Sequence, residues 1–170
     1  MQIRDFTTRR LSVTSWRSVL QSPQKRAALE QKLAVILTPN VLTPLPEPLW
    51  LPRGQGQIAE WVSARAAESD VYSVTDFGSG VLLGLLILAP GDAKTVHLGY
   101  MLAEAAWGSG YATEVVGGLL HALPEQQGIT VVAGVEPRNP ASSAVLLKSG
   151  FELSEDLSTP DIRFYTYEIV

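Results

Sequence analysis

A glycine-rich turn between an expected strand and an expected helix constrains the fold of this chain more than any other feature. Residues 96–102 alternate as in a strand, and residues 111–123 carry apolar side chains at helical spacing. Gly108 and Gly110 lie where that helix begins. A helix start has unpaired N–H groups and the positive end of the helix dipole, so glycine there lets an anion approach the backbone. The pattern predicts a phosphate-binding turn.

The spacing of this turn does not name the anion. The run WGSGYAT matches the dinucleotide-binding fingerprint only in part, because Thr113 stands where the third glycine belongs. It also lacks the Gly-Lys-Ser/Thr ending of a nucleotide-triphosphate loop. A helix that simply begins after two turn glycines and binds nothing remains an alternative.

Length and composition limit the architecture and exclude several classes of function. A chain of 170 residues, 46% of them hydrophobic, forms one domain with a sizeable core, so we expect a single domain over 1–170. The net charge of −4, without a dense run of Lys or Arg, argues against nucleic-acid binding. The absence of cysteine excludes disulfides, a thiolate nucleophile and cysteine-based metal sites.

The expected location follows from the apolar stretches. The first eleven residues contain no signal-peptide-like apolar run, and the longest apolar stretch, residues 81–89, is too short to span a bilayer. We therefore expect a cytoplasmic protein without a membrane partner. The positive mean hydropathy is compatible with a homodimer interface as well as with a generous core.

The remaining elements read as helices followed by a mixed sheet built largely of hairpins, with one strand–helix–strand crossover. We expect strands at 7–14, 71–75, 81–88, 96–102, 129–135, 151–153 and 162–170, two short helices within 16–37 separated at Pro23, and helices at 58–68, 111–123 and 141–149.

A proline-rich segment, residues 38–56, follows the first helices. Its five prolines argue against regular helix or central strand, so we expect a long loop. Loops of this length are often functional. The alternatives are a surface wrap anchored by Trp50 and a lid that contacts the substrate.

Three passages carry a resemblance to a known family. They are LGYMLAEAAWGSGYATEVV from Leu98, NPASSAVLLKSGF from Asn139 and, more weakly, TTRRLSVTSW near the start. The chain resembles, over nearly its full length, the GNAT superfamily of acyl-CoA-dependent N-acyltransferases, and within it the ribosomal-protein alanine N-acetyltransferase type. Two positions depart from the pattern: Ala105 stands where the pyrophosphate loop usually has Gln or Arg, and Leu146 where many members have a tyrosine acid.

The resemblance implies an α/β (α+β) fold, with a mixed, mostly antiparallel central sheet of about seven strands, about four flanking helices, and a splayed strand pair at the CoA site. It also implies an enzyme that moves an acetyl group from acetyl-CoA to a primary amine, either a protein N-terminus or a small molecule, by direct attack in a ternary complex. No metal is expected. The implied cofactor-binding residues are Met101, Leu102, Ala103, Trp107, Gly108, Ser109, Gly110, Tyr111, Ala112, Thr113, Asn139 and Ser142.

Two residues are candidates for the proton transfers that the resemblance implies. His97 is the candidate base, because it lies on the motif strand and imidazole titrates near neutrality. A structural or surface histidine is the alternative. Ser142 is the candidate donor to the departing thiolate, or else a helix cap near Asn139. Backbone N–H groups near Leu102 would stabilise the oxyanion, and Tyr100 is expected in the core or the acyl pocket.

The acceptor site should be framed by the proline-rich segment and the loop 154–161. Four acidic residues near that loop would attract a cationic amine, namely Glu152, Glu155, Asp156 and Asp161. Glu104 and His121 are expected to face solvent. Two other hypotheses remain: a non-catalytic acyl-CoA-binding or sensing module of the same fold, and a dinucleotide-binding protein.

Overall fold

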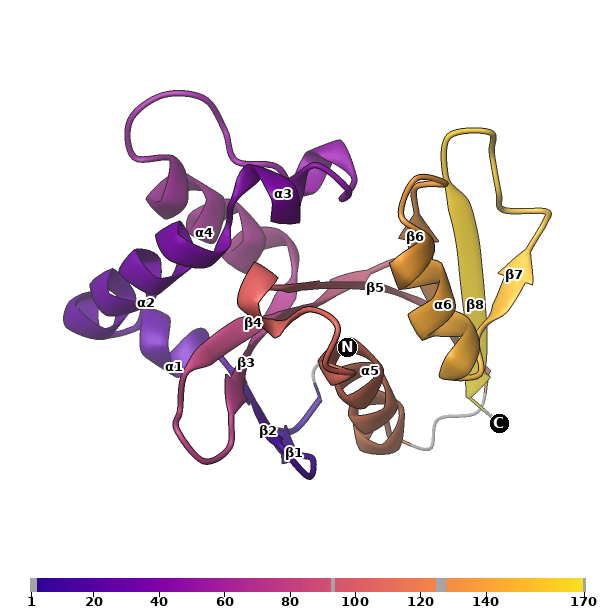
Figure 1. The fold of residues 1–170 in the computed structure, drawn as a ribbon, viewed down its shortest axis with the longest axis horizontal. Coiled ribbons are helices and arrows are strands. Elements are labelled where there is room, and N and C mark those ends of the chain that lie inside the picture. The colour runs from indigo at the N-terminus through magenta and orange to yellow at the C-terminus, as the bar shows by residue number, and fades with distance from the viewer. Residues whose placement is uncertain (1–2, 93, 125–127, 170) are drawn as a thin grey trace.

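The structure is a computed structural model that describes residues 3–92, 94–124 and 128–169. In these ranges the chain forms one eight-stranded sheet in the order β1-β2-β3-β4-β5-β6-β8-β7 (Figure 1). The strands are β1 (Phe6–Thr7), β2 (Leu11–Ser15), β3 (Asp70–Asp76), β4 (Leu82–Pro90), β5 (Thr95–Leu102), β6 (Ile129–Val135), β7 (Glu152–Ser154) and β8 (Arg163–Ile169). Val170, the end of the last expected strand, lies outside the described residues.

Helices cover both faces of this sheet. They are α1 (Arg17–Leu20), α2 (Pro23–Ile36), α3 (Pro39–Leu42), α4 (Gln57–Glu68), α5 (Tyr111–Ala122) and α6 (Pro140–Lys148), with short 3-10 turns η1 (Glu47–Leu49) and η2 (Glu104–Ala106). β5 and β6 run parallel, whereas the neighbouring pairs β4–β5 and β6–β8 are antiparallel. The expected mixed, mostly antiparallel sheet is therefore confirmed. No helix in the described part of the chain is long and apolar enough to cross a membrane.

Two expectations about the first half of the chain were wrong in detail. The single strand at 7–14 is a hairpin, because the hydroxyl of Thr8 accepts the N–H of Leu11 at 3.1 Å and closes a turn. The proline-rich segment contains the helix α3. Pro39 occupies the first helical position, where its missing N–H costs nothing, and the side chain of Thr38 caps the helix.

Two hydrophobic clusters lie on opposite faces of the sheet. One packs under α5 and α6 and includes Val116 and Leu146. The other packs under α1, α2 and α4, where Trp16 and Trp61 meet edge to face with ring centroids 6.5 Å apart. Figure 1 shows α5 on one side of β4 and β5, and α2 and α4 on the other. Burying each of these large side chains contributes about 1.5–3 kcal/mol.

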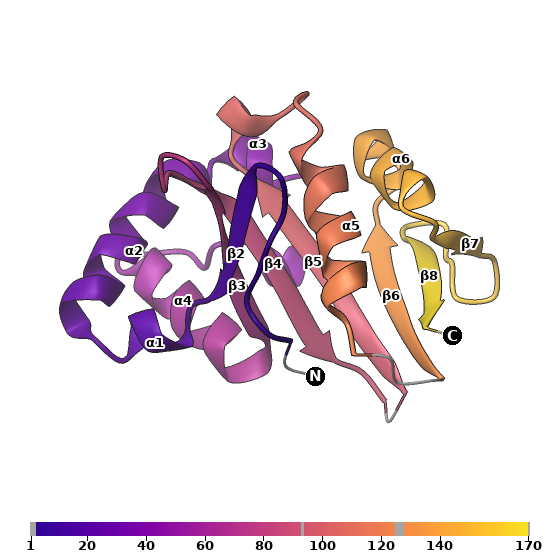
Figure 2. The ribbon, with the colours of Figure 1, turned by 90° about the horizontal axis from the view of Figure 1, so that it is seen from below.

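The feature of the sheet that positions the site is the divergence of β5 from β6. The two strands pair only from Thr95 with Thr130 to His97 with Val132, although each continues for several residues. The ribbons separate beyond these pairs (Figures 1 and 2). The space between the diverging ends of the strands is called the β5–β6 gap below, and it confirms the expected splayed strand pair.

Candidate active site

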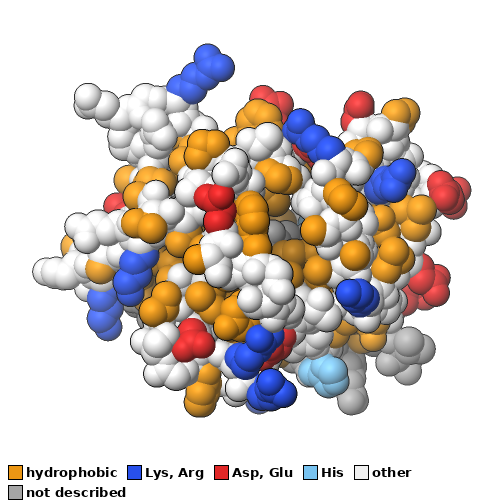
Figure 3. Space-filling model, viewed as in Figure 1, with side chains coloured by type: hydrophobic (Ala, Val, Ile, Leu, Met, Phe, Trp, Pro, Cys, Tyr) orange, Lys and Arg blue, Asp and Glu red, His pale blue; other side chains and the backbone are white. Residues whose placement is uncertain are grey.

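A cavity of about 440 Å³ passes through the β5–β6 gap. Arg65, Glu68 and the proline-rich segment line it on the α4 face, and Tyr100 and Ser142 on the α6 face. Apolar side chains gather along the hollow that divides this side of the molecule (Figure 3). The cavity is therefore lined from both faces of the sheet.

Tyr100 and Ser142 are joined inside this cavity. The phenol oxygen of Tyr100 lies 2.7 Å from the Oγ of Ser142. Burial raises the pKa of Tyr100 to about 12, although the hydrogen bond with Ser142 acts in the opposite direction. Tyr100 therefore keeps its proton at neutral pH and can donate it to the serine, which leaves the serine's own hydrogen free to point elsewhere. Sequence reasoning placed Tyr100 in the core or the acyl pocket and missed this hydrogen bond.

Asn139, not Ser142, caps the helix α6. Its Oδ1 accepts the backbone N–H of Ser142 at 3.2 Å. Pro140 at the first helical position needs no partner for an N–H, so Asn-Pro is a favourable helix start. The alternative in which Ser142 caps this helix is thus wrong, and its hydroxyl is used for Tyr100 instead. Leu146 is fully buried beneath the same helix.

His97 lies at the closed end of the gap, where the pairing with β6 ends. It is exposed and lines the cavity. Side chains alternate along a strand, so His97 and Tyr100 project from opposite faces of the sheet. His97 and Ser142 therefore line the same cavity, but from opposite faces of the sheet. Asp92 lies near His97. The pKa of the Asp92 carboxyl is lowered by hydrogen bonds from Thr95 and Lys94, with a contribution from the charge of His97.

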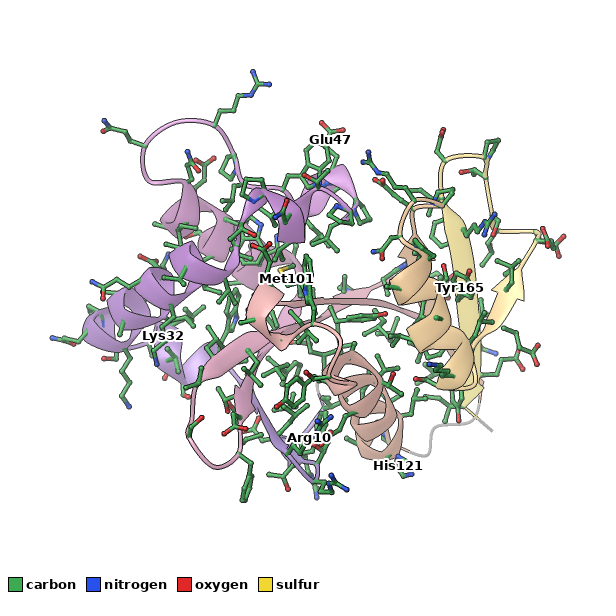
Figure 4. All side chains as sticks on the ribbon, in the orientation of Figure 1. Arg10, Lys32, Glu47, Met101, His121 and Tyr165 are labelled. Atoms are coloured by element: carbon green, nitrogen blue, oxygen red, sulfur yellow. The ribbon has the colours of Figure 1, made fainter. Side chains whose placement is uncertain are left out.

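Along the end of β5, some backbone groups pair with β4 and others face the β5–β6 gap, where the pantetheine arm is expected. Ala103 donates its N–H to Leu83 at 2.7 Å, and bonded residues alternate in an antiparallel ladder, so Met101 also pairs with β4. The Met101 side chain is buried among α2 and α4 residues (Figure 4). By the same alternation Tyr100 and Leu102 turn their backbone groups toward the gap. The carbonyl of Leu102 accepts the indole N–H of Trp107 at 2.9 Å.

The glycine turn, residues 107–110, leads into α5 with an uncapped start. Gly108 and Gly110 have φ of 71° and 77°, a left-handed conformation that side chains disfavour. Gly110 is the N-cap and has no side chain to hydrogen-bond the first N–H groups of the helix. Ser109 is exposed, and Tyr111, Ala112 and Thr113 form the half-buried first turn. The local geometry fits an anion, as the sequence predicts.

The proline-rich segment bridges the two sides of the gap. Thr38 and Asn40 each donate a hydrogen bond of 2.7 Å to the carboxylate of Glu104, which follows β5. Arg138, which follows β6, donates to the carbonyl of Thr43 at 3.2 Å. Glu104 is exposed as expected, but these bonds give it a structural role that the sequence did not reveal, and they lower its pKa.

Trp50 is not the anchor of this segment. Its side chain is 40% exposed, whereas Leu49 and Leu51 pack against the hydrophobic cluster under α2 and α4. Leu49 also lines the cavity, and its carbonyl accepts the indole N–H of Trp61 at 3.0 Å. The segment thus both covers the core and forms part of the cavity wall on the α4 face.

The acidic residues near the loop 154–161 do not line the cavity; all four are exposed, namely Glu152, Glu155, Asp156 and Asp161. The charged pair that lines it is Arg65 with Glu68, joined at 2.8 Å. The other histidine, His121, places Nδ1 2.7 Å from the carbonyl of Gly117 on α5 and does not line the cavity. The described residues hold no group of three or more His, Asp or Glu side chains able to bind a metal ion.

Comparisons with known proteins agree with this geometry. Residues 22–152 match the acetyltransferase (GNAT) domain family. The uncharacterized protein YkkB of Bacillus subtilis (strain 168) is 30% identical over 121 residues, which cover 66% of this chain and 70% of that protein.

Two solved structures share the fold. The ribosomal-protein α-N-acetyltransferase RimL, in complex with coenzyme A, has a TM-score of 0.71 at 19% identity, covering 98% of this chain and 97% of RimL. The microcin self-immunity acetyltransferase MccE, in complex with acetyl-CoA and AMP, has a TM-score of 0.68 at 17% identity, covering 95% of this chain and 93% of MccE. From its family match, the chain belongs to the GNAT family of acetyltransferase domains.

Proposed function

We propose that this chain transfers the acetyl group of acetyl-CoA to a single primary amine, with a peptide N-terminus as the preferred acceptor. The observation that carries the proposal is the cavity that crosses the β5–β6 gap. In this proposal the thioester would enter from the α6 face and the amine from the α4 face, and the two would meet in the cavity. The coenzyme A and acetyl-CoA held by RimL and MccE support this choice of cosubstrate.

The cofactor end of the site rests on backbone groups. The uncapped N–H groups at residues 108–113 would take the pyrophosphate, which carries negative charge to the positive end of α5. The backbone groups of Tyr100 that face the gap would hydrogen-bond the pantetheine arm, whereas the carbonyl of Leu102 already accepts the indole N–H of Trp107. Asn139 and Ser142 lie at the inner end of that path. Trp107 flanks the turn. Met101 and Ala103, whose backbones pair elsewhere, contribute by positioning β5.

The reaction needs positioning more than covalent participation by the protein. The amine nitrogen forms a bond to the thioester carbon while the carbon–sulfur bond breaks and leaves its electron pair on sulfur. Holding both reactants in attack geometry can supply several kcal/mol of the barrier. The N–H of Leu102 is the proposed donor to the carbonyl oxygen as that oxygen gains charge.

Ser142 is the proposed proton donor to the sulfur. Its Oγ lies 2.7 Å from the phenol oxygen of Tyr100, and the raised pKa of Tyr100 keeps the phenol protonated, so the phenol can donate this hydrogen bond. The serine hydrogen can then turn toward the leaving thiolate, and Tyr100 can restore it through the same 2.7 Å contact. A free thiol has a pKa of about 8.5, so the departing thiolate is only weakly basic. It therefore needs only modest stabilisation from a proton donor.

His97 is the proposed base on the acceptor side. It opens onto the cavity on the α4 face, opposite Ser142, where an incoming ammonium would lose its proton. Histidine is the side chain that most often serves as a general base in such proton transfers. The residue is exposed, and its Nε2 lies near Gly91, 3.1 Å from the position that a Cβ on this glycine would take.

The charge of the acceptor side supports a monoamine rather than a polyamine. Glu68 is paired with Arg65, so the two charges that line the cavity cancel. Its other walls are largely apolar, with Pro44, Leu45 and Phe164 among them. RimL, an acetyltransferase of a protein α-amino group, is a structural relative of this chain. A peptide N-terminus with a small apolar side chain fits these features.

Release of free thiol from acetyl-CoA tests the function. Peptides with free N-termini, free lysine and spermidine should be compared as acceptors at fixed acetyl-CoA, with the acetylated peptide located by mass spectrometry. We expect turnover to be fastest with the peptides. Coenzyme A binding without thiol release on any amine, unaffected by His97→Ala, would support the non-catalytic binding module instead. The single domain, the cytoplasmic location and the homodimer stay predictions.

A further inference from the structure

Arg10 reaches the glycine turn from a distant part of the chain. It lies in the turn of the β1–β2 hairpin, which Figure 2 shows beside the first turn of α5. Its Nε lies 2.6 Å from Glu114, and its backbone N–H donates to the other oxygen of that carboxylate at 2.8 Å. Its guanidinium carbon lies 4.2 Å from the ring centroid of Tyr111.

The packing of the hairpin explains how Arg10 is held in place. A Cβ on Gly118 would lie 2.7 Å from the side chains of Phe6 and Thr8, so the glycine lets the hairpin approach α5 closely. The hydroxyl of Thr8 also donates to Glu114 at 2.5 Å. Glu114 is thereby fixed by two hairpin residues. The Arg10 guanidinium has one edge on a carboxylate and one face on an aromatic ring.

The outer end of the guanidinium remains available. Among the described residues, the hydrogen bonds and ion pairs of the Arg10 side chain involve Nε alone. One terminal nitrogen, Nη2, lies 3.7 Å from the position that a Cβ on Gly110 would take. Arg10 thus presents free donors beside the turn whose backbone N–H groups face the expected pyrophosphate.

The glycine turn needs such a cation. Residues 103–113 contain no Lys or Arg, and their one charged residue is Glu104. A pyrophosphate bound there by N–H groups alone would keep most of its charge. Arginine suits the task because its planar fork can bond a carboxylate along one edge and a phosphate along another.

We propose that Arg10 is a cosubstrate-binding residue whose Nη groups donate to the pyrophosphate of acetyl-CoA, with Glu114 and Tyr111 holding the guanidinium in place. The proposal rests on the proposed function, since it needs coenzyme A in the glycine turn. In this proposal the β1–β2 hairpin supplies a positive charge to the cosubstrate site, which residues 103–113 lack.

Calorimetric titration with coenzyme A tests the assignment. Arg10→Gln should raise the Kd for coenzyme A by roughly tenfold or more, the loss expected for one charge-assisted hydrogen bond. Arg10→Lys, which keeps the charge without the fork, should fall between that variant and the wild type. Arg9→Gln is the matched control, because it removes the same charge from the exposed neighbouring residue and should leave the Kd unchanged.

Two further arms identify the phosphate. With 3′-dephospho-CoA, which keeps the pyrophosphate, the penalty of Arg10→Gln should persist. With pantetheine, which has no phosphate, it should vanish. Salt near about 1 M, where charges are screened within roughly 3 Å, should reduce the penalty for coenzyme A. A merely structural arginine would affect all three ligands alike and show no such salt dependence.

The outcomes separate this inference from the function beneath it. Equal coenzyme A affinities of wild type, Arg10→Gln and Arg10→Lys would overturn the role of Arg10 alone. A penalty lost with 3′-dephospho-CoA would also overturn it, since the contact would then be to the ribose phosphate. A folded wild type that fails to bind coenzyme A would overturn the proposed function. Circular dichroism of each variant verifies folding, and Arg10→Lys serves if Arg10→Gln does not fold.

Discussion

The phenol oxygen of Tyr100 lies 2.7 Å from the Oγ of Ser142, and this contact joins β5 to the first turn of α6 across the β5–β6 gap. The two residues are 42 positions apart in the chain. The pair combines a phenol that stays protonated at neutral pH with a serine hydroxyl within hydrogen-bond distance of it. This relationship is the basis for the first prediction.

Tyr100→Phe should lower kcat by roughly fivefold to tenfold with little change in the KM for acetyl-CoA, because the ring stays while one hydrogen bond is lost. Ser142→Ala should have a similar effect. The double variant should be no worse than the more impaired single variant, since both act through one contact. Steady-state kinetics by thiol release measures all three.

Tyr167→Phe is the control for this series. Its ring packs against Phe151 with centroids 5.5 Å apart, away from the cavity lining, and its hydroxyl should be dispensable. Additive losses in the double variant would contradict a relay between Tyr100 and Ser142. Because the pKa of Tyr100 is raised to about 12, its ionisation should cause no alkaline fall in activity below about pH 10.

His97→Gln should reduce kcat/KM by about 100-fold at neutral pH, the lower range for losing a general base. The KM for acetyl-CoA should change little, because His97 is proposed to act on the amine. Steady-state thiol release with varied amine measures the loss.

His121→Gln provides the matched control, because the chain has two histidines and His121 lies outside the cavity lining. Its kcat/KM should match that of the wild type. An unchanged kcat/KM in His97→Gln would show that another group accepts the proton.

Glu114→Gln should lower stability by about 1–2 kcal/mol at neutral pH, since Glu114 is 18% exposed and accepts charged hydrogen bonds. Burial raises the pKa of Glu114, but bonds from Thr8 and Arg10 outweigh it, so the folded pKa lies below the ordinary value of 4.5. The stabilisation is therefore present above pH 4.5 and is lost as the pH falls through the lower folded pKa. Thermal melts against pH measure the loss.

Glu60→Gln is the control for position in a helix. Glu60 occupies the same place in α4, four residues after a left-handed glycine N-cap, but it is exposed. Its loss should change the Tm far less. Equal effects of the two substitutions would assign the stabilisation to the helix dipole rather than to the hairpin.

Gly117→Ala and Gly118→Ala should change stability in opposite directions. A Cβ on Gly117 meets nothing within 4 Å, so alanine should stabilise α5 by about 0.5–1 kcal/mol through helix propensity. A Cβ on Gly118 would overlap Phe6 and Thr8, so alanine should destabilise by about 1–3 kcal/mol. Urea unfolding of both variants gives the comparison. Two stabilised variants would contradict close packing of the hairpin on α5.

Local sequence patterns correctly predicted the glycine turn, the start of α6 and the strand β5. Gly108 and Gly110 adopt the left-handed conformations that a glycine pair before a helix indicates, and Pro140 starts α6 as its position after Asn139 suggests. Strand alternation placed β5 correctly. These features are set by neighbours in the chain, through backbone sterics, turn chemistry and hydrophobic period.

Errors arose where a local signal was weak or had two meanings. The run TTRRLSVT contains enough β-favouring residues for one strand, but a side-chain bond from Thr8 folds it into a hairpin. Prolines indicated a loop, although Pro39 after Thr38 also starts a helix. Trp50 suggested a buried anchor, yet the neighbouring Leu49 and Leu51 pack against the core. Propensity alone does not decide such cases.

The sequence by itself determined the strand–turn–helix unit and the glycine turn, because these depend on residues within a few positions of one another. Only the tertiary structure decided that Tyr100 meets Ser142 and that Arg10 meets Glu114, 104 residues away. Such contacts depend on the order of strands in the sheet and on how closely helices pack against it. No local period encodes that order, since it is set by the burial of the whole core.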